Sequence, residues 1–510
     1  MEDMEKFPWW TEEQMKLADE VEEFLEEIRS EAEKAWWRRE YPHQIMKKIA
    51  EKGYFGVDVP KKYGGMELGL TGACIVTETL SRLPTIGLTF LVSSLGGNHQ
   101  LHVYGTEEQK ERWFPKIAKG QIGAVCITEP FVGSDAAATA TTAVKEGDHY
   151  ILNGKKRFIS NAGVADRYMV YARTSDDPAD RKKYRHLTGF LVEKGMPGFK
   201  LEKINDLIGF DTTPNGVLSL DNVKVSLENM VGKEGDGWMA MMSGLNYERT
   251  IGSCMLVGML KECVRLPVWY MERRVQFGQV TSNFPTNQFK VADIIKNLKL
   301  ARLMLYHTAH LIDMGKEPAT ESAVLKCFAS DTLLTCATEA IQLMGGDGLT
   351  KFYGLEWILR DAKVHQITMG TNEIMKTLIY RAGIRDMKDD LKINYKRVID
   401  EELGVPISSP RPEKRKDFSE ETLIEVLCED YRSNPGLHMS REDIKAEFEV
   451  EDEKLDEVLV SLEEKGLVDL YRDRRGGIAL AKATYQALLK QHPPEYYSWF
   501  PAWYREEDKF

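Results

Sequence analysis

Hydroxyl side chains recur in two short segments near the middle of this 510-residue sequence. The segment AVCITEPFVGSDAAAT (124–139) carries Thr128 and Ser134, and RFISNAG (157–163) carries Ser160. The hydroxyls alternate with apolar residues, as on a surface that holds a flat heterocycle and hydrogen-bonds its edge. An ordinary strand and turn would explain each hydroxyl separately, so the residues alone leave both interpretations open.

The elements that must position these segments change in type along the chain. In the first 120 residues, apolar positions recur at helical intervals, and Thr11 and Gln14 have the spacing of a capping box. Residues 121–234 have short apolar runs separated by turn residues, which is typical of strands. Within them, Asn153-Gly154 predicts a tight hairpin turn, because such turns need positive φ.

Long helical periodicity returns after residue 234, and a segment rich in proline and charge follows it. The last part has the order helix, helix, helix, hairpin, which is typical of a winged-helix module. We therefore predict a mainly α protein with a central β domain and an added module. The expected parts are a helical domain (1–120), a β-barrel (121–234), a four-helix bundle (235–395), a linker (396–417) and a winged-helix-like extension with an aromatic tail (418–510).

Composition restricts the class of protein. The chain has 43% hydrophobic residues and a net charge of −12, which favours a folded protein and disfavours nucleic acid as a partner. It has no apolar run of membrane-spanning length and no basic, apolar N-terminal signal, so we expect a soluble, cytoplasmic protein. No disulfide framework or metal site is indicated by the scattered cysteines, Cys74, Cys126, Cys254, Cys263, Cys327, Cys336 and Cys428.

Three separated motifs resemble the acyl-CoA dehydrogenase family. CITEPFVGSD (126–135) resembles its first signature, and AIQLMGGDGL (340–349) with RDAKVHQITMGTNEI (360–374) resembles its second. The order and intervals agree over residues 10–390. The resemblance implies an FAD enzyme that removes two hydrogens across Cα–Cβ of an acyl-CoA thioester. A carboxylate would take the α-proton, and the β-hydrogen would pass as hydride to flavin N5.

The resemblance also assigns a cofactor site. Phe158, Ile159 and Ser160 match the Trp-Ile-Thr triplet that covers the flavin, with Phe in place of Trp. Arg274, Phe277, Gln342, Gly345 and Gly346 resemble residues that reach the FAD of a neighbouring subunit. The full set of expected cofactor residues is Val125, Ile127, Thr128, Ser134, Phe158, Ile159, Ser160, Arg274, Phe277, Gln342, Gly345, Gly346, Thr371 and Glu373.

The catalytic glutamate common in the family is absent from its usual position, where this chain has Met369. Glu248, in GLNYERTIGS (244–253), stands where isovaleryl-CoA dehydrogenase and some long-chain enzymes carry their base. We expect Glu248 to be catalytic, with a pKa raised toward neutrality by burial. The alternative is a surface glutamate paired with Arg249 or Arg273.

The expected substrate contacts come from the same segments. The backbone N–H of Met369 would polarise the thioester carbonyl together with an FAD ribityl hydroxyl. The expected substrate-binding residues are Ser134, Asn246, Arg249, Met369 and Gly370. The position of Glu248 favours a branched, cyclic or otherwise bulky acyl-CoA.

The extension does not have the charge of a DNA-binding module. Residues 411–510 contain 16 basic and 24 acidic residues, a net charge of −8. We expect no nucleic-acid partner and no membrane span. The family implies a homotetramer or homodimer that passes electrons to an electron-transfer flavoprotein. Two alternatives are an acyl-CoA oxidase using oxygen and a non-dehydrogenating, nucleic-acid-associated member of the fold.

Overall fold

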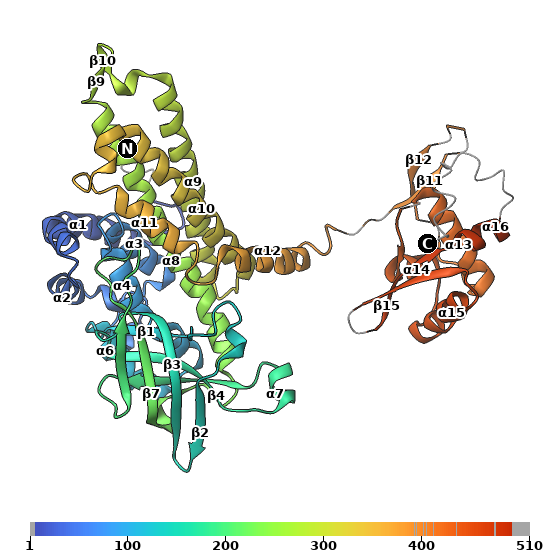
Figure 1. The fold of residues 1–510 in the computed structure, drawn as a ribbon, viewed down its shortest axis with the longest axis horizontal. Coiled ribbons are helices and arrows are strands. Elements are labelled where there is room, and N and C mark those ends of the chain that lie inside the picture. The colour runs from blue at the N-terminus through green and yellow to red at the C-terminus, as the bar shows by residue number, and fades with distance from the viewer. Residues whose placement is uncertain are drawn as a thin grey trace. The chain divides into compact units, whose positions relative to one another are not determined.

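The computed structural model describes residues 6–391, 393, 395–400, 402–403, 405–411, 413–434, 436–473 and 476–491 (Figure 1). The chain divides into two compact units, Met1–Asp386 and Met387–Phe510. Each unit buries its own hydrophobic cluster. The predicted aromatic tail, residues 492–510, lies outside the described residues.

The first unit begins with helices, as the periodicity predicts. The capping box is confirmed, because the Gln14 N–H donates to Thr11 Oγ1 at 3.2 Å and the Thr11 N–H donates to Gln14 Oε1 at 3.0 Å. The helices are α1 (Glu12–Arg38), α2 (His43–Glu51), α3 (Gly69–Leu80), α4 (Ile86–Leu95), α5 (Asn98–Tyr104) and α6 (Glu107–Ala118), with 3₁₀ turns η2 (Tyr54–Gly56) and η3 (Lys61–Tyr63).

A β domain follows the helices, and its strands form one sheet in the order β6-β7-β3-β2-β4-β5-β8, with β1 added in parallel to β4. The strands are β1 (Gly123–Cys126), β2 (Thr142–Glu146), β3 (His149–Ser160), β4 (Arg167–Arg173), β5 (Leu187–Glu193), β6 (Phe199–Ile204), β7 (Asn215–Ser226) and β8 (Met230–Val231). The short helices of this domain are η4 (Ala136–Ala138), α7 (Pro178–Lys182) and η5 (Leu227–Asn229).

The predicted turn at Asn153-Gly154 is wrong, because both residues lie inside β3. The strand register shifts there between Leu152 and Gly154, and Gly154 has a φ of 153°. A Cβ on Gly154 would come within 2.8 Å of the Thr141 Cα atom. The glycine therefore permits a β-bulge and a close backbone approach, which are the other common reasons for glycine in a strand.

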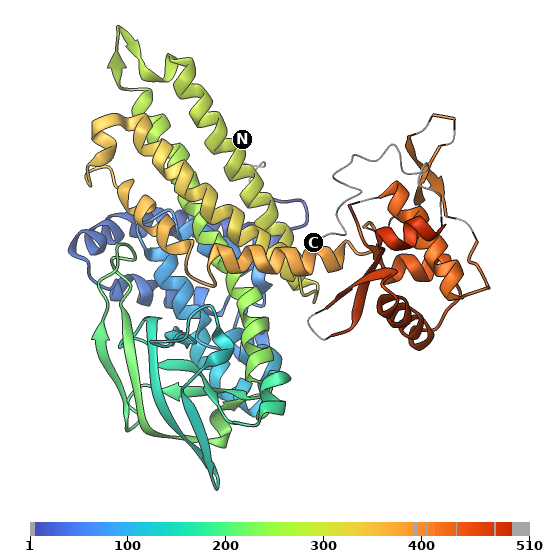
Figure 2. The same cartoon turned by 45° about the vertical axis from the view of Figure 1, so that its right-hand side comes forward.

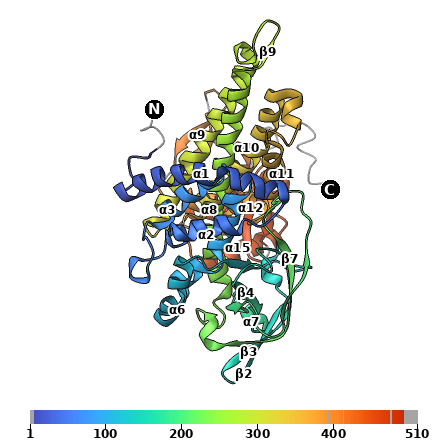
Figure 3. The ribbon, with the colours of Figure 1, turned by 90° about the vertical axis from the view of Figure 1, so that its left-hand side faces the viewer.

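Helices return after β8, and the fold class of two helical domains around a central β domain is confirmed. Figures 2 and 3 show the long helices of this region side by side. The elements are α8 (Gly237–Met271), β9 (Val275–Gln276), β10 (Gln279–Val280), η6 (Thr281–Asn283), α9 (Pro285–Asp313), α10 (Ala319–Met344), η7 (Gly345–Leu349), α11 (Glu356–His365) and α12 (Asn372–Asp386).

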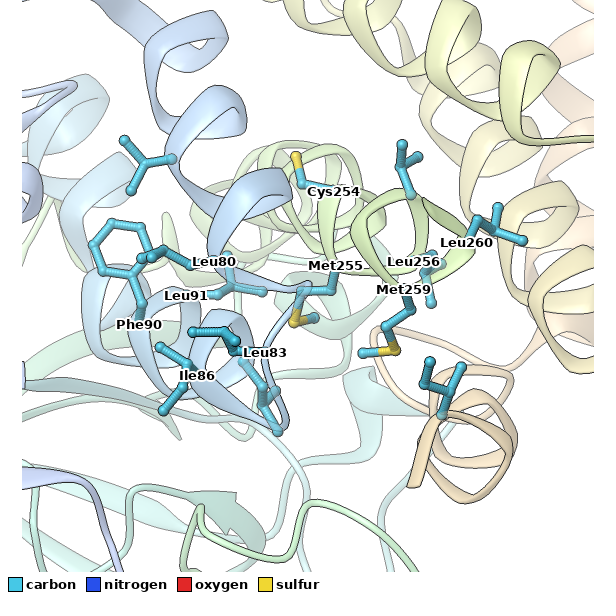
Figure 4. Close-up of a cluster of buried hydrophobic side chains, with 14 of the residues drawn as sticks. Leu80, Leu83, Ile86, Phe90, Leu91, Cys254, Met255, Leu256, Met259 and Leu260 are labelled. Carbon is cyan, nitrogen blue, oxygen red and sulfur yellow. The ribbon is translucent and has the colours of Figure 1, made fainter. Parts of the chain in front are cut away.

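Packing of α8 against the N-terminal helices forms a large part of the core. Leu83, in the turn before α4, lies beside Met255 of α8 (Figure 4), and Phe90, Leu91 and Met259 belong to the same buried cluster. These side chains are fully or almost fully buried. The long helix that carries Glu248 is therefore held in the core along one face.

The described part of the second unit contains four helices and two small sheets. Its elements are β11 (Tyr395–Ile399), β12 (Pro406–Pro410), α13 (Glu420–Ser433), β13 (Met439–Ser440), α14 (Arg441–Glu447), α15 (Asp452–Glu464), β14 (Val468–Arg472), β15 (Ile478–Ala483) and α16 (Tyr485–Gln491). The strands β13, β15 and β14 form one sheet in that order.

The predicted linker contains regular structure, since β11 pairs with β12 as an antiparallel hairpin. The Asp400 carboxylate accepts the backbone N–H groups of Glu402 and Leu403, which stabilises the turn. Composition alone did not predict this hairpin, because its turn is closed by local side-chain bonding.

Two further features concern the whole described chain. None of the helices in the described part is long and apolar enough to cross a bilayer. All seven cysteines are free and buried.

Candidate functional site

The ends of β1 and β3 bring the two hydroxyl-bearing segments together. The Arg157 N–H donates to the Thr128 carbonyl at 2.8 Å, and the Lys156 ammonium donates to the Ile127 carbonyl at 3.2 Å. Thr128 and Ile127 are partly buried. The structure therefore places Thr128 beside the strand that carries Phe158 and Ser160.

Phe158 lies at an irregular point of β3. The register shifts between Lys156 and Ile159, and Phe158 has a φ of 58°, which a bulky residue rarely adopts. Its ring is 49% exposed, with the Arg157 guanidinium 4.5 Å from the ring centroid. Ile159 points the other way and is buried in the β-domain core. This geometry leaves an aromatic face open to a ligand, while Ile159 could offer only its backbone.

The loop after β1 exposes backbone donors. Among the described residues, none accepts from the backbone N–H groups of Gly133, Ser134 and Asp135. Ser134 itself is exposed. Consecutive free N–H groups in a turn form an anion-binding concavity, and a pyrophosphate is a suitable ligand for one.

Glu248 lies on α8 and is only 7% exposed. Burial raises its pKa to about 7, although the neighbouring Arg249 opposes the shift. A carboxyl group with a pKa near neutrality can take a proton at physiological pH. The predicted alternative, a solvated surface glutamate, is therefore wrong.

Met369 reaches the same face of α8. A Cβ on Gly252, one helical turn after Glu248, would overlap the Met369 thioether. Gln100 of α5 lies over Gly244, one turn before Glu248, where a Cβ would likewise overlap its amide. Glu248 therefore projects between two glycines whose missing side chains leave room for these neighbours.

Arg249 links α8 to the loop between α11 and α12. Its Nε donates to the Met369 carbonyl at 3.2 Å, and its Nη1 donates to Asn246 Oδ1 at 3.1 Å. Arg249 is buried, and this burial lowers its pKa to about 10. The structure thus brings together Asn246, Glu248, Arg249 and Met369.

Thr371 and Glu373 begin the following helix. The Ile374 N–H donates to Thr371 Oγ1 at 3.4 Å, so Thr371 caps α12, and Glu373 is exposed in the first turn. Gly370 has a φ of 91°, which only glycine adopts easily. These residues lie beside Met369 along the chain and belong to the same group.

Five of the expected cofactor residues lie at the other end of this unit. Arg274 and Phe277 belong to the β9–β10 hairpin, far from β1 and β3 in Figure 1, and Phe277 is 94% exposed. Gln342, Gly345 and Gly346 lie near this hairpin, since Tyr270 at the end of α8 donates to Asp347 Oδ2 at 2.5 Å. Nothing within 4 Å would contact a Cβ at Gly345 or Gly346. Within one chain, these residues do not meet the group around Glu248.

A small cavity adjoins the helix of Glu248. It has a volume of about 10 Å³, close to the space that one water molecule needs. Its lining residues are Phe55, Val57, Asp58, Ala73, Phe90, Ser94, Leu95, Tyr247 and Ile251. None of these nine residues is cationic.

Two neighbours of the site have no signal in the sequence. Tyr171 of β4 is buried, and its pKa is raised by burial and by the charge of Glu248. Gln100 lies over Gly244. Both belong to no motif and reach the site only through tertiary packing, so sequence reasoning did not find them.

Comparisons with known proteins agree with this architecture. Residues 11–121, 124–223 and 235–384 match the acyl-CoA dehydrogenase N-terminal, middle and C-terminal domains. An acyl-CoA dehydrogenase of Bacillus subtilis is 36% identical over 373 residues, covering 72% of this chain and 97% of the relative. Mitochondrial isovaleryl-CoA dehydrogenase of Pongo abelii is 34% identical over 377 residues, covering 73% and 89%.

A solved structure shows the same fold. Butyryl-CoA dehydrogenase from Megasphaera elsdenii is 30% identical with a TM-score of 0.71, and the match covers 74% of this chain and all of that one. Each match falls short of the full chain. The family models end before the second unit, at residue 384.

Proposed function

Because this chain belongs to the acyl-CoA dehydrogenase family, a family of FAD-binding oxidoreductases that act on CH–CH bonds, we propose that it dehydrogenates an acyl-CoA thioester with Glu248 as its base. The observation that carries this proposal is the burial of Glu248 on α8, with a pKa raised to about 7 by that burial. Met369, at the family's usual position for the base, lies beside the same helix and cannot accept a proton.

Proton removal follows from this arrangement. The α C–H bond breaks, the proton passes to the Glu248 carboxylate, and the electron pair moves toward the thioester oxygen as an enolate. The backbone N–H of Met369 is available to bind that oxygen, because it has no acceptor among the described residues. Preorganised donors of this kind stabilise charge that develops in the transition state.

The residues present fit FAD. Thr128 and the exposed face of Phe158 are suited to a flat ring, and the free N–H groups at Gly133, Ser134 and Asp135 are suited to a pyrophosphate. FAD would supply the acceptor for the β-hydrogen. The cofactor roles predicted for Val125, Ile127, Ser160, Thr371 and Glu373 are part of the same proposal.

A second copy of the chain would complete the cofactor site. Arg274, Phe277 and the glycines of η7 are exposed at a distance from the other cofactor residues of their own chain. Open glycine backbone, aromatic surface and a guanidinium together suit the nucleotide half of FAD. We propose a homodimer or homotetramer in which each copy contributes this group to its neighbour.

The proposed substrate is a branched, cyclic or otherwise bulky acyl-CoA. The position of Glu248 on α8 supports this class. A dicarboxylyl-CoA is not expected, because no motif in the sequence places a cation for its second carboxylate.

Anaerobic mixing of the FAD-loaded protein with a panel of acyl-CoA thioesters tests the proposal. Isobutyryl-, isovaleryl- and cyclohexanecarbonyl-CoA should bleach the flavin faster than octanoyl-CoA, and glutaryl-CoA should not bleach it. No bleaching with any of them would refute the proposed reaction. Admitting oxygen then separates a dehydrogenase, which should reoxidise slowly in air and rapidly with electron-transfer flavoprotein, from an oxidase.

A further inference from the structure

The loop between α11 and α12 has an unusual backbone. Met369 and Gly370 are successive residues with positive φ, at 58° and 91°. A methionine in this region is strained, and such strain persists only where the surroundings enforce it. Among the described residues, none accepts from the backbone N–H groups of Met369, Gly370 and Thr371. The loop thus presents three consecutive free donors next to Glu248.

Two buried cations hold the carbonyl groups of this loop. Arg249 donates to the Met369 carbonyl at 3.2 Å, and the Lys326 ammonium of α10 donates to the Gly370 carbonyl at 2.8 Å. Lys326 also donates to Asn372 Oδ1 at 2.7 Å and to the Gln366 carbonyl at 3.3 Å. It therefore contacts the beginning and the end of the loop.

Lys326 is costly for the fold. Its exposed fraction is 0%, and its three acceptors are neutral oxygens, with no carboxylate among them. A buried ammonium whose hydrogen-bond acceptors are all neutral is expensive, and lysine is almost never fully buried unless it is paired. An uncharged side chain could fill this volume more cheaply, which points to a role for the charge.

Each cation binds one end of a peptide group whose other end is free. The Gly370 carbonyl and the Thr371 N–H belong to one peptide, and the Met369 carbonyl and the Gly370 N–H belong to the preceding one. A cation on the carbonyl fixes the orientation of the peptide and increases the partial positive charge on its N–H. The N–H groups of Gly370 and Thr371 therefore point away from the cations and are polarised by them. The Met369 N–H belongs to the peptide before these two, and the cations act on it by holding the loop in place.

We propose that Lys326 is a positioning residue for the reaction, which together with Arg249 holds this loop so that its free N–H groups stabilise the enolate oxygen formed when Glu248 takes the α-proton. This inference rests on the proposed function. It adds a charged group from α10 that belongs to none of the motifs read from the sequence.

The groups around Lys326 determine how its charge depends on pH. They are Arg249 of α8, Cys327 and Asp331 of α10, His365 of α11 and Glu373 of α12. Asp331 is engaged by the amides of Gln366 and Asn372, each at 2.7 Å. His365 is neutral, because burial lowers its pKa to about 3. Burial, with Arg249 adding repulsion, lowers the pKa of Lys326 to about 8. The ammonium is therefore lost as the pH rises through that value.

Three variants of the full-length, FAD-loaded protein test the inference. Lys326→Met removes the charge, Lys326→Arg keeps it, because an arginine does not deprotonate in proteins, and Lys316→Met alters an exposed lysine as a control. The readouts are kcat and KM across the pH range, the flavin content, and the pKa of bound acetoacetyl-CoA. The bound enolate of acetoacetyl-CoA is seen through its charge-transfer absorbance with the flavin.

Lys326→Met should keep FAD and a KM near that of the wild type, lower kcat by about 10- to 100-fold, and raise the pKa of bound acetoacetyl-CoA. Lys326→Arg should retain more turnover than Lys326→Met and lose the decrease in kcat that the wild type shows above about pH 8. Lys316→Met should match the wild type throughout.

An unchanged kcat and an unchanged acetoacetyl-CoA pKa in Lys326→Met would overturn the inference. Loss of FAD in proportion to activity would also overturn it, because it would show a purely structural role. A wild type that oxidises acyl-CoA leaves the proposed function intact in both cases. A wild type that neither oxidises acyl-CoA nor binds acetoacetyl-CoA would overturn both.

Discussion

A single pair of positions, 248 and 369, carries most of the functional argument at the scale of the residue. Met369 alone would indicate a protein that has lost proton abstraction, and Glu248 alone would be an ordinary helix glutamate. The structure places the Met369 thioether one helical turn from Glu248 along α8. The two positions face the same volume, so Glu248 can supply the base that position 369 lacks.

The acid limb of the activity profile should report Glu248. Its pKa is raised to about 7 by burial, so the carboxylate that takes the proton forms as the pH rises through that value. We expect kcat to increase about tenfold for each pH unit below the midpoint and to level off between the midpoint and about pH 8. Steady-state rates from about pH 5 to 8 measure this limb. A midpoint near the usual glutamate pKa would contradict the burial argument.

Residue-scale prediction was limited to side chains within recognisable motifs. Thr128, Glu248, Arg249 and Met369 all lie in motifs, and the structure brings the last three together. Tyr171, Gln100 and Lys326 come from β4, α5 and α10, and only tertiary packing places them beside the site. No local spacing distinguishes such a residue from an ordinary core position.

At the scale of the element, a buried ion cluster joins α3, α8 and α9 behind the site. Glu78 of α3 accepts from Lys261 Nζ at 2.9 Å, Arg302 Nε at 2.8 Å and the Tyr306 hydroxyl at 2.5 Å. Burial opposes the ionisation of Glu78, but these three partners outweigh it and lower its pKa to about 2. The cluster fixes the position of the helix that carries Glu248.

Glu78→Gln should lower the free energy of unfolding by about 3–5 kcal/mol, because it removes the buried carboxylate that the Lys261 ammonium and the Arg302 guanidinium both contact. The sign of the pH dependence follows from the depressed pKa. The stabilisation is complete above the unfolded pKa of about 4.3 and is lost as the pH falls from there toward about 2.

Urea unfolding at neutral and acid pH measures both effects, and the stability difference between wild type and variant should shrink as the pH falls. Glu67→Gln, which alters an exposed carboxylate that accepts the Lys61 N–H at 3.2 Å, is the control. A constant difference at every pH would contradict the assigned pKa.

Periodicity predicted the type of the elements better than their boundaries. The capping box at Thr11 depends on two residues three apart, and it formed as predicted. The pair Asn153-Gly154 suits both a hairpin turn and a β-bulge, and only the pairing of β3 with β7 decides between the two structures. The β11–β12 hairpin depends on hydrogen bonds to the Asp400 side chain, and a hydropathy pattern does not predict such bonds.

At the scale of the whole molecule, the two units differ in whether they contain predicted site residues. Every predicted site residue lies in Met1–Asp386. The described elements of the second unit follow the order α13, α14, α15 and a β14–β15 hairpin, and the winged-helix-like interpretation stays a prediction. Several cations of its described part pair with carboxylates, which makes those cations poorly suited to phosphates. The ion pairs include Arg411–Asp443, Arg415–Glu425, Lys396–Glu447, Arg441–Asp452, Lys465–Glu420 and Arg472–Glu463.

The proposed sharing of FAD between copies predicts complementation. An Arg274→Ala/Phe277→Ala chain should spoil its neighbour's cofactor site, and a Glu248→Gln chain should spoil only its own reaction. Each variant alone should be nearly inactive. In a mixed dimer, the chain with intact Glu248 receives intact Arg274 and Phe277 from its partner, so co-expression should restore measurable turnover. Failure to restore it, with mixed dimers shown to form, would contradict the shared site.

The central claim is that Glu248 removes the α-proton, and one comparison tests it most directly. Glu248→Gln keeps the size of the side chain and removes the base. Its matched control is Glu272→Gln, which alters an exposed carboxyl at the end of the same helix. Both proteins should bind FAD and acyl-CoA. In anaerobic stopped-flow mixing with the best acyl-CoA, Glu248→Gln should bleach the flavin at least about 100-fold more slowly than the wild type, and Glu272→Gln should match the wild type. A bleaching rate for Glu248→Gln close to that of the wild type would show that the base lies elsewhere.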